Sequence, residues 1–173
     1  MKVTILREAG YEEAMLGLSL SYNSHPGRMP ARAEQLIGMD KGHNKFAESI
    51  CVWIDCTAPR YWWSQFDTYR IGVTKQSEST MHTLMRGPLT EHDFEEHICG
   101  TWLRMLNKEI EQGNFDGAKR HLPEGFLQRR IICTNYKALR HIYQQRWDHK
   151  LAEWTYFTDQ LKAQLEHPRW IIA

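Results

Sequence analysis

The stretch LPEGFLQRRIICTNYKALRHIYQQR, which spans Leu122 to Arg146, predicts a strand that leads directly into a helix. Over residues 126–133 it is rich in Ile, Phe and Cys with interleaved basic residues, a composition typical of a strand. Thr134 and Asn135 favour a helix start, because a short oxygen-bearing side chain accepts a hydrogen bond from the first turn. We therefore expect a helix that begins near Asn135 and ends near Arg146.

Arg146 is the unusual residue of this stretch. At about 100° per residue it lies on the same stripe of the helix as Asn135, Leu139 and Ile142, so it belongs to the apolar side. A partly buried guanidinium is costly unless a carboxylate, a phosphate or a polarised carbonyl meets it. Two structural explanations stay open beside a functional one: pairing with an acid such as Asp148, or extension of the head group into water.

Length and composition favour a single domain over residues 1–173. The chain has 173 residues, a net charge of +1 and ordinary hydrophobic and charged fractions. A charge near zero argues against a general electrostatic grip on nucleic acid or on an anionic membrane. Since the sequence has no membrane-length apolar run and no secretory segment at its start, we expect a cytoplasmic protein with neither of these partners.

The cysteines and histidines do not predict a metal site. Cys51, Cys56, Cys99 and Cys133 form no CxxC pair and read as small hydrophobic residues in a reducing compartment. His92 and His97 are five positions apart, which places them about 140° apart around a helix. A structural zinc is therefore not expected.

The pattern of the whole chain predicts an α+β fold, with a small antiparallel or mixed sheet and several packed helices. Hydrophobic periodicity, capping residues and Gly or Pro positions give the following expectations: strands at 1–9 and 46–56; helices at 11–22, 31–39, from Pro59 to Arg70, 90–112, 116–120 and 148–165; and loops at 23–30 and 71–80. Thr90 and Asp93 resemble a capping box at the start of the helix at 90–112.

Three sets of polar residues are candidates for a site: Gln65 and Arg70 with the loop after them; Lys119 and Arg120; and Asn135, His141 and Arg146. Arg forks to phosphate, and Gln or Asn can match the edge of a base, so such side chains suit a nucleotide. Taken alone, each set is better explained as solvated surface charge.

The spacing of the opening stretch resembles the C-terminal signature of flavin-dependent thymidylate synthases, which methylate dUMP using flavin, a folate carbon donor and a nicotinamide reductant. That family places a basic residue before Leu-Pro, then a strand, then an Asn that opens a helix closing with an Arg, and later a helix with a Trp. The matching residues here are Lys119, Leu122, Pro123, Asn135, Arg146 and Trp154.

The resemblance extends upstream, to about Gly42. The segment GHNKFAESICVWIDCTAPRYWWSQFDTYR is similar to the family's Gly-His, strand, Ala-Pro and aromatic helix, which precede the flavin-binding motif RHRxxSxNExSxRY. The corresponding window here is TYRIGVTKQSESTM. It keeps Arg70, whereas Tyr69 replaces the His of the motif, Gln76 its Glu and Thr80 its last Arg.

This resemblance implies a flavin-dependent thymidylate synthase-like fold and a homotetramer with shared sites, which we expect to form through the aromatic segment Tyr61 to Phe66. It implies FAD as cofactor and folate and NADPH as co-substrates. The residues implied at the pyrimidine nucleotide are Gln65, Lys119, Arg120 and Arg146, with Arg146 also polarising the ring. Those implied at the flavin are His43, Arg70, Gln76, Asn135 and His141.

Two alternatives accompany the implied reductive methylation of dUMP at C5. The first is a diverged homologue, of a phage or regulatory type, that binds a pyrimidine nucleotide or a protein partner without flavin catalysis. The second is another pyrimidine-modifying enzyme, in which the altered segment from Arg70 to His82 serves a different cofactor or one-carbon group. Both follow from the same substituted motif.

Overall fold

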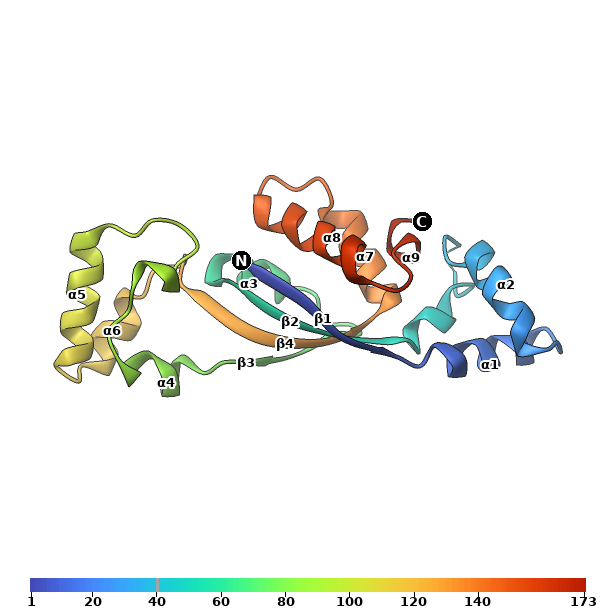
Figure 1. Cartoon of the computed structure of the whole chain (residues 1–173), viewed down its shortest axis with the longest axis horizontal. Coiled ribbons are helices and arrows are strands. Elements are labelled where there is room, and N and C mark those ends of the chain that lie inside the picture. Colours follow the sequence, from blue (N-terminus) through green and yellow to red (C-terminus); the bar gives the residue numbers. More distant parts are fainter. Residues whose placement is uncertain (40) are drawn as a thin grey trace. The chain divides into compact units, whose positions relative to one another are not determined.

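The computed structural model describes residues 1–39 and 41–173 and has the α+β fold that the sequence predicts. Its four strands are hydrogen-bonded in the order β1-β2-β4-β3 and run antiparallel to their neighbours (Figure 1). They are β1 (Lys2–Ala9), β2 (Cys51–Pro59), β3 (Thr74–Ser77) and β4 (Leu127–Asn135). The helices of the described residues are α1 (Tyr11–Ser21), α2 (Met29–Leu36), α3 (Arg60–Phe66), α4 (Thr80–Thr83), α5 (Gly100–Glu111), α6 (Phe115–His121), α7 (Tyr136–Arg146), α8 (Ala152–Gln164) and α9 (Arg169–Ile172).

The alternation of β2 shows why this segment is central. Val52, Ile54, Cys56 and Ala58 are fully buried, whereas the residues between them are half-buried, as expected when successive side chains point to opposite faces. Backbone hydrogen bonds at both ends hold it antiparallel to β4: Arg60 N–H to Phe126 O at 3.1 Å, and Tyr136 N–H to Ile50 O at 3.3 Å. The strand therefore has the buried pattern that its sequence indicates.

The chain divides into two compact units, which are described separately; the single domain expected from length stays a prediction. Unit 1 contains Met1–Lys2, Cys56–Thr68 and Gln76–Arg130. Its helices α5 and α6 pack together around a core of Leu84, Phe94, Ile98, Leu106, Ile110, Ala118, Leu122 and Phe126. On α3, Trp62, Trp63 and Phe66 are fully buried and contact one another through their rings. Most of this aromatic segment is thus already covered within the chain.

Unit 2 contains Val3–Asp55, Tyr69–Lys75 and Ile131–Ala173. Helix α7 packs against α8 and α9, and α1 packs against α2 (Figure 1). Tyr136, Trp154 and Trp170, one from each of α7, α8 and α9, are buried. The hydroxyl of Tyr136 donates to Glu8 and accepts the N–H of His167 at 3.0 Å, so burial of this phenol leaves no polar atom of it unsatisfied.

Two expectations in unit 1 were wrong in part. The predicted helix at 90–112 is a helix only over Gly100–Glu111, because Phe94 pairs as an antiparallel bridge with Phe126 and their rings stand 5.8 Å apart. The capping box of Thr90 and Asp93 is present, but it caps the start of a short 3-10 helix at Glu91–Asp93 and not the start of α5. Tertiary packing thus overrides the helical periodicity of the first turns.

The segment predicted as a loop at 71–80 contains the strand β3, and α4 begins at Thr80. β3 stands last in the sheet order, and its residues are half-buried or exposed. An edge strand of this kind needs no hydrophobic alternation, so its polar sequence did not predict it.

Smaller differences concern element ends. A 3-10 helix at Pro26–Arg28 lies inside the predicted loop at 23–30, and α2 starts at Met29 with Pro30 in its first turn, where a missing N–H costs nothing. The strand expected at 46–56 begins at Cys51, after a 3-10 turn at Lys45–Glu48, and continues to Pro59. The short α9 was not predicted at all.

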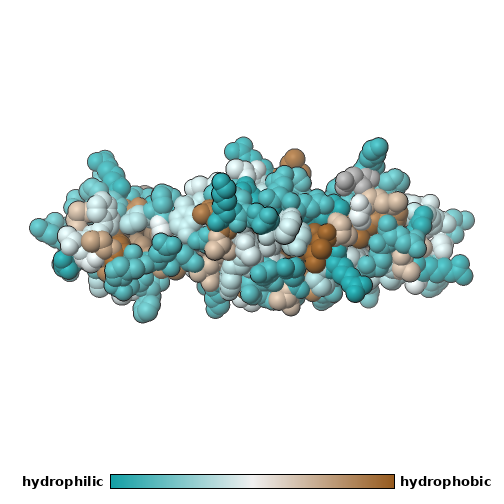
Figure 2. Space-filling model, turned by 90° about the horizontal axis from the view of Figure 1, so that it is seen from above, coloured by the Kyte–Doolittle hydropathy of each residue, from teal (hydrophilic) through white to brown (hydrophobic). Residues whose placement is uncertain are grey.

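No helix in the described part of the chain is long and apolar enough to cross a membrane. On the face seen in Figure 2, hydrophobic residues appear as separate small areas among hydrophilic ones. Isolated exposed hydrophobic side chains of this kind are ordinary on protein surfaces.

Candidate functional site

Asn135 and Arg146 lie at the two ends of α7. Asn135 is the N-cap, and its Oδ1 accepts the N–H of Ala138 at 2.9 Å, which confirms the predicted helix start. The segment after Tyr69 comes close to this cap: a Cβ on Gly72, whose φ is +68°, would lie 2.8 Å from Asn135 Nδ2. The helix then ends at Arg146, as predicted.

Arg146 is half-buried among aromatic side chains of unit 2. Its Nε–H donates to the hydroxyl of Tyr69 at 2.7 Å, and its guanidinium carbon lies 4.7 Å from the ring centroid of Trp154 and 5.6 Å from that of Tyr69. Trp154 is fully buried and Tyr69 is 8% exposed. A cation over aromatic faces is stabilised by the negative potential of the rings, more strongly when water is excluded. The sequence alternatives for Arg146, an acid or solvent, did not include this environment.

A hydrogen-bonded chain extends from Arg146 along α7. The hydroxyl of Tyr69 donates to Gln145 Oε1 at 2.9 Å, and Gln145 Nε2 lies 3.1 Å from His141 Nε2. Because an amide nitrogen donates, this contact is a hydrogen bond in the tautomer of His141 that carries its proton on Nδ1. The structure thus joins His141 and Arg146, which the resemblance assigns to the flavin and to the pyrimidine.

The positive charge of Arg146 affects the pKa of the neighbouring His149. The pKa of His149 is lowered, first by burial and then by the positive charges of Arg146 and Lys150. Its Nδ1 accepts the N–H of Leu151 at 3.1 Å, and its ring meets that of Trp154 at 6.2 Å. The neutral form of His149 is the one that suits this positive surrounding.

Unit 1 holds a second basic group, around Lys119. The Lys119 ammonium donates to the hydroxyl of Thr80, a buried residue that stands where the flavin motif has its last Arg. Burial, followed by the positive charge of Arg60, lowers the pKa of Lys119. Arg120 is exposed, and Gln65 is half-buried on α3. Lys119 and Thr80 are thus brought together from positions 39 residues apart.

The remaining residues predicted at the flavin are on the surface. His43, Arg70 and Gln76 are exposed, as is His141 on α7. His43 lines a cavity of about 480 Å³ in unit 2, together with Lys45 and residues of α1. Among the described residues, the hydrogen bonds do not join His43 to the group around Arg146. Tyr69, Gln145 and Thr80 were missed as members of these groups, and the substitutions at 69 and 80 in the motif were the only signal for two of them.

The segment at 69–75 carries two basic residues: Arg70, which the flavin motif shares, and Lys75, which replaces the Asn of the motif. Arg70 is exposed, and Lys75 Nζ donates to the backbone O of Tyr69 at 3.4 Å. An arginine and a lysine in one short segment match the charge and the donor chemistry that a diphosphate requires. The residues present therefore fit the phosphate part of FAD, although the rest of the motif differs.

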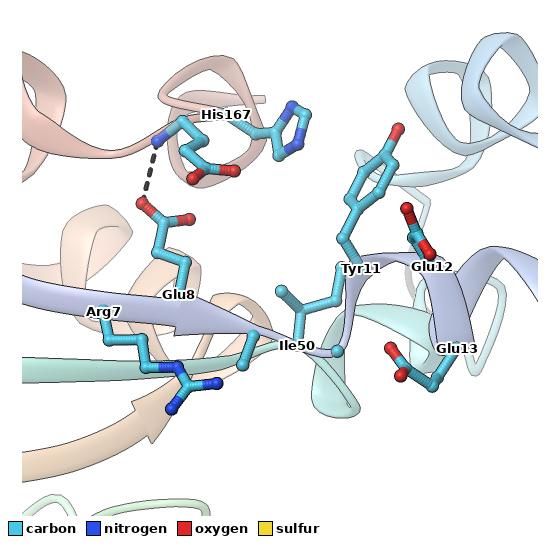
Figure 3. A pocket seen from close by; sticks show the side chains of 10 residues that line it. Arg7, Glu8, Tyr11, Glu12, Glu13, Ile50 and His167 are labelled. Atoms are coloured by element: carbon cyan, nitrogen blue, oxygen red, sulfur yellow. Dashed lines mark hydrogen bonds between the residues drawn. The ribbon is translucent and has the colours of Figure 1, made fainter.

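A separate cavity of about 360 Å³ lies beside the start of α1 (Figure 3). Its lining includes the labelled carboxylates Glu8, Glu12 and Glu13 and the rings of Tyr11 and His167, which stack at 4.6 Å. Glu8 Oε1 accepts the N–H of Glu166 at 2.8 Å, so this carboxylate ties β1 to the chain before α9. None of the predicted site residues lines this cavity, and its contacts read as structural.

The whole fold is similar to that of two solved structures. One is the flavin-dependent thymidylate synthase ThyX from Helicobacter pylori, complexed with FAD and dUMP, at 17% identity and a TM-score of 0.80, covering 99% of this chain and 98% of that one. The other is Thymidylate Synthase X from the same organism, with FAD and dUMP, at 16% identity and a TM-score of 0.81, covering 99% and 97%. No protein-family model matches the sequence, and no curated protein is similar to it at the sequence level. The comparison establishes the fold.

Proposed function

We propose that this protein is a flavin-dependent thymidylate synthase-like enzyme, which methylates dUMP reductively at C5 with FAD, a folate carbon donor and NADPH. The observation that carries the proposal is Arg146, held at the end of α7 by Tyr69 and Trp154. The full-length similarity to synthases complexed with FAD and dUMP supports it. A guanidinium has the charge and the planar donor geometry that an anionic or carbonyl ligand requires.

In this proposal Arg146 binds the pyrimidine. A cation beside a ring carbonyl stabilises the negative charge that develops as a carbon or hydride adds to the ring. Within unit 1, we propose the basic group of Lys119 and Arg120, with Gln65, for nucleotide binding. Lys119 suits a phosphate, since an arriving anion stabilises the ammonium against the burial and the repulsion from Arg60 that lower its pKa.

Residues of unit 2 hold the cofactor in this proposal. Arg70 and Lys75 meet the diphosphate of FAD, and His43, Asn135 and His141 complete the group. Bound flavin supplies the redox chemistry, whereas the protein orients the two rings and excludes water. The caps and hydrogen bonds of Asn135 and His141 keep these side chains in fixed orientations.

We also propose a homotetramer in which copies share sites. Because Trp62, Trp63 and Phe66 are buried within the chain, contact between copies along 61–66 falls to the more accessible Tyr61, Ser64 and Gln65. Light scattering on the purified protein should give four times the 20.5 kDa chain mass. A monomer would count against shared sites.

One observation favours the alternative of nucleotide binding without flavin chemistry. Tyr69 replaces a residue of the flavin motif, and its hydroxyl is engaged with Arg146 and Gln145. Absorbance separates the two functions: purified protein with a flavin band, or protein that takes up added FAD, supports the enzyme. Colourless protein that fails to take up FAD contradicts it, and leaves nucleotide binding as the function to test.

Turnover tests the complete proposal. The protein is incubated with FAD, NADPH, dUMP and folate labelled in its one-carbon group, and the label is followed into the nucleotide product. We expect labelled dTMP from the wild type and none from Arg146→Ala. Label that stays in the folate, with FAD bound to the protein, would refute thymidylate synthesis.

A further inference from the structure

Tyr69 is held more tightly than an exposed loop residue would be. It is 8% exposed, and its ring meets those of Trp154 at 6.1 Å and His141 at 6.3 Å, both edge to face. Its neighbour Arg70 is exposed. The chain thus turns one side chain of this segment into the interior of unit 2, where its hydroxyl meets α7.

The hydroxyl has a fixed direction. A phenol has one proton to donate, and the contact with Gln145 Oε1 at 2.9 Å takes it. The lone pairs of the oxygen then face Arg146, whose Nε–H donates to them at 2.7 Å. Gln145 is oriented in turn by His141 at 3.1 Å. The order of donors and acceptors is therefore consistent from His141 to Arg146.

We propose that Tyr69 is a positioning residue for Arg146, with Gln145 setting the direction of the Tyr69 hydroxyl. This inference rests on the proposed nucleotide site. A guanidinium on a flexible side chain loses rotational freedom when it binds a ligand, and a partner that fixes it beforehand lowers that cost. Trp154 supports the flat face of the guanidinium at 4.7 Å, and Tyr69 fixes its Nε–H edge.

The hydrogen bond to Tyr69 fixes the orientation of the Nε–H edge of Arg146 before a ligand binds. A substitution that removes only the hydroxyl lets the guanidinium turn about its last bonds while leaving its charge unchanged. Tyr69→Phe is that substitution, because it keeps the ring and its contacts with Trp154 and His141.

The first measurement needs no nucleotide. In ¹⁵N-labelled protein, Arg146→Lys identifies the Nε–H signal of Arg146 by its disappearance. We expect the exchange of this proton with water to be about tenfold faster or more in Tyr69→Phe, because its acceptor is gone. Tyr156→Phe, which changes a 40% exposed tyrosine of α8, should leave the signal as in the wild type. Unchanged exchange in Tyr69→Phe would overturn the positioning role.

The second measurement is the dissociation constant for dUMP by calorimetry. Tyr69→Phe should bind about tenfold more weakly, the loss expected for a hydrogen bond to a charged group, and Gln145→Leu should lie between it and the wild type. In turnover, Tyr69→Phe should lower kcat as well as raise KM, since Arg146 stabilises the negative charge that develops on the pyrimidine ring. A wild type that binds and a Tyr69→Phe that binds equally well would overturn the inference; a wild type that does not bind dUMP would instead overturn the proposed function on which it rests.

Discussion

The groups around Arg146 and around Lys119 hold a cation in two different ways. Arg146, in unit 2, has a neutral phenol at its Nε and the faces of two aromatic rings near its guanidinium carbon. Lys119, in unit 1, donates to the hydroxyl of Thr80, and burial followed by the positive charge of Arg60 lowers its pKa. One environment stabilises a fixed charge and the other disfavours it.

The surroundings of Arg146 control the orientation of the cation, whereas those of Lys119 control its charge state. A guanidinium stays protonated in nearly any surrounding, so its aromatic shell mainly controls direction. An ammonium can lose its proton, and a neighbouring cation disfavours its charged form. A bound anion offsets this repulsion and stabilises the charged form. We infer that the Arg146 group is suited to a ring whose carbonyl must be met at a fixed angle, and the Lys119 group to a phosphate.

The largest expected effect concerns the aromatic shell of Arg146, which is formed by the rings of Tyr69 and Trp154. Trp154→Ala removes a fully buried ring, which should lower the free energy of unfolding by about 3–5 kcal/mol. Urea unfolding measures this loss. Tyr156→Ala on the same helix, where the ring is 40% exposed, should change it by less than about 0.5 kcal/mol. Equal losses for the two would mean that the shell is not a rigid core element.

The second effect concerns the segment that carries Tyr69 to α7. Gly72→Ala combines a positive φ with a Cβ 2.8 Å from Asn135 Nδ2. Gly113→Ala is a matched control, because its φ is +69° and no atom lies within 4 Å of its Cβ position. The control should cost about 1 kcal/mol and Gly72→Ala about 1–2 kcal/mol more. If the two variants unfold at the same urea concentration, the segment is not held against the helix cap.

The smallest effect distinguishes the Lys119 group by its pH dependence. Because the folded-state pKa of Lys119 lies below its ordinary value of 10.5, its contribution to stability is complete above about pH 10.5 and is lost as the pH falls through the folded pKa. Relative to Lys119→Met, the wild type should therefore gain stability as the pH rises toward about pH 10.5. Urea unfolding across this range, with the exposed Lys108→Met as control, checks it. A constant difference would mean that Arg60 and burial do not act on Lys119 as described.

The features that could be predicted from the sequence are local ones. The strand and helix of 126–146 follow from composition, the N-cap of Asn135 and periodicity, all within a few residues. The buried alternation of β2 follows in the same way from Val52, Ile54 and Cys56. These signals are short-range, so they survive without knowledge of the fold.

The features that could not be predicted join distant positions. Tyr69 and Arg146 are 77 residues apart, and nothing in the pattern around either identifies the other. Phe94 leaves its predicted helix because it pairs with Phe126, which is 32 residues away. The edge strand β3 has a polar sequence and takes its structure from its neighbour β4. In each case a tertiary contact decides the outcome.

Titration of dUMP into wild type and Arg146→Ala by calorimetry tests the central claim most directly, with Arg169→Ala as a control that removes an exposed arginine of α9. We expect saturable binding by the wild type and the control, and a loss of about 100-fold or more in Arg146→Ala, because its charged contact with the pyrimidine is removed. Equal binding by Arg146→Ala and the wild type, with both folded, would show that Arg146 is held by Tyr69 and Trp154 for structure alone.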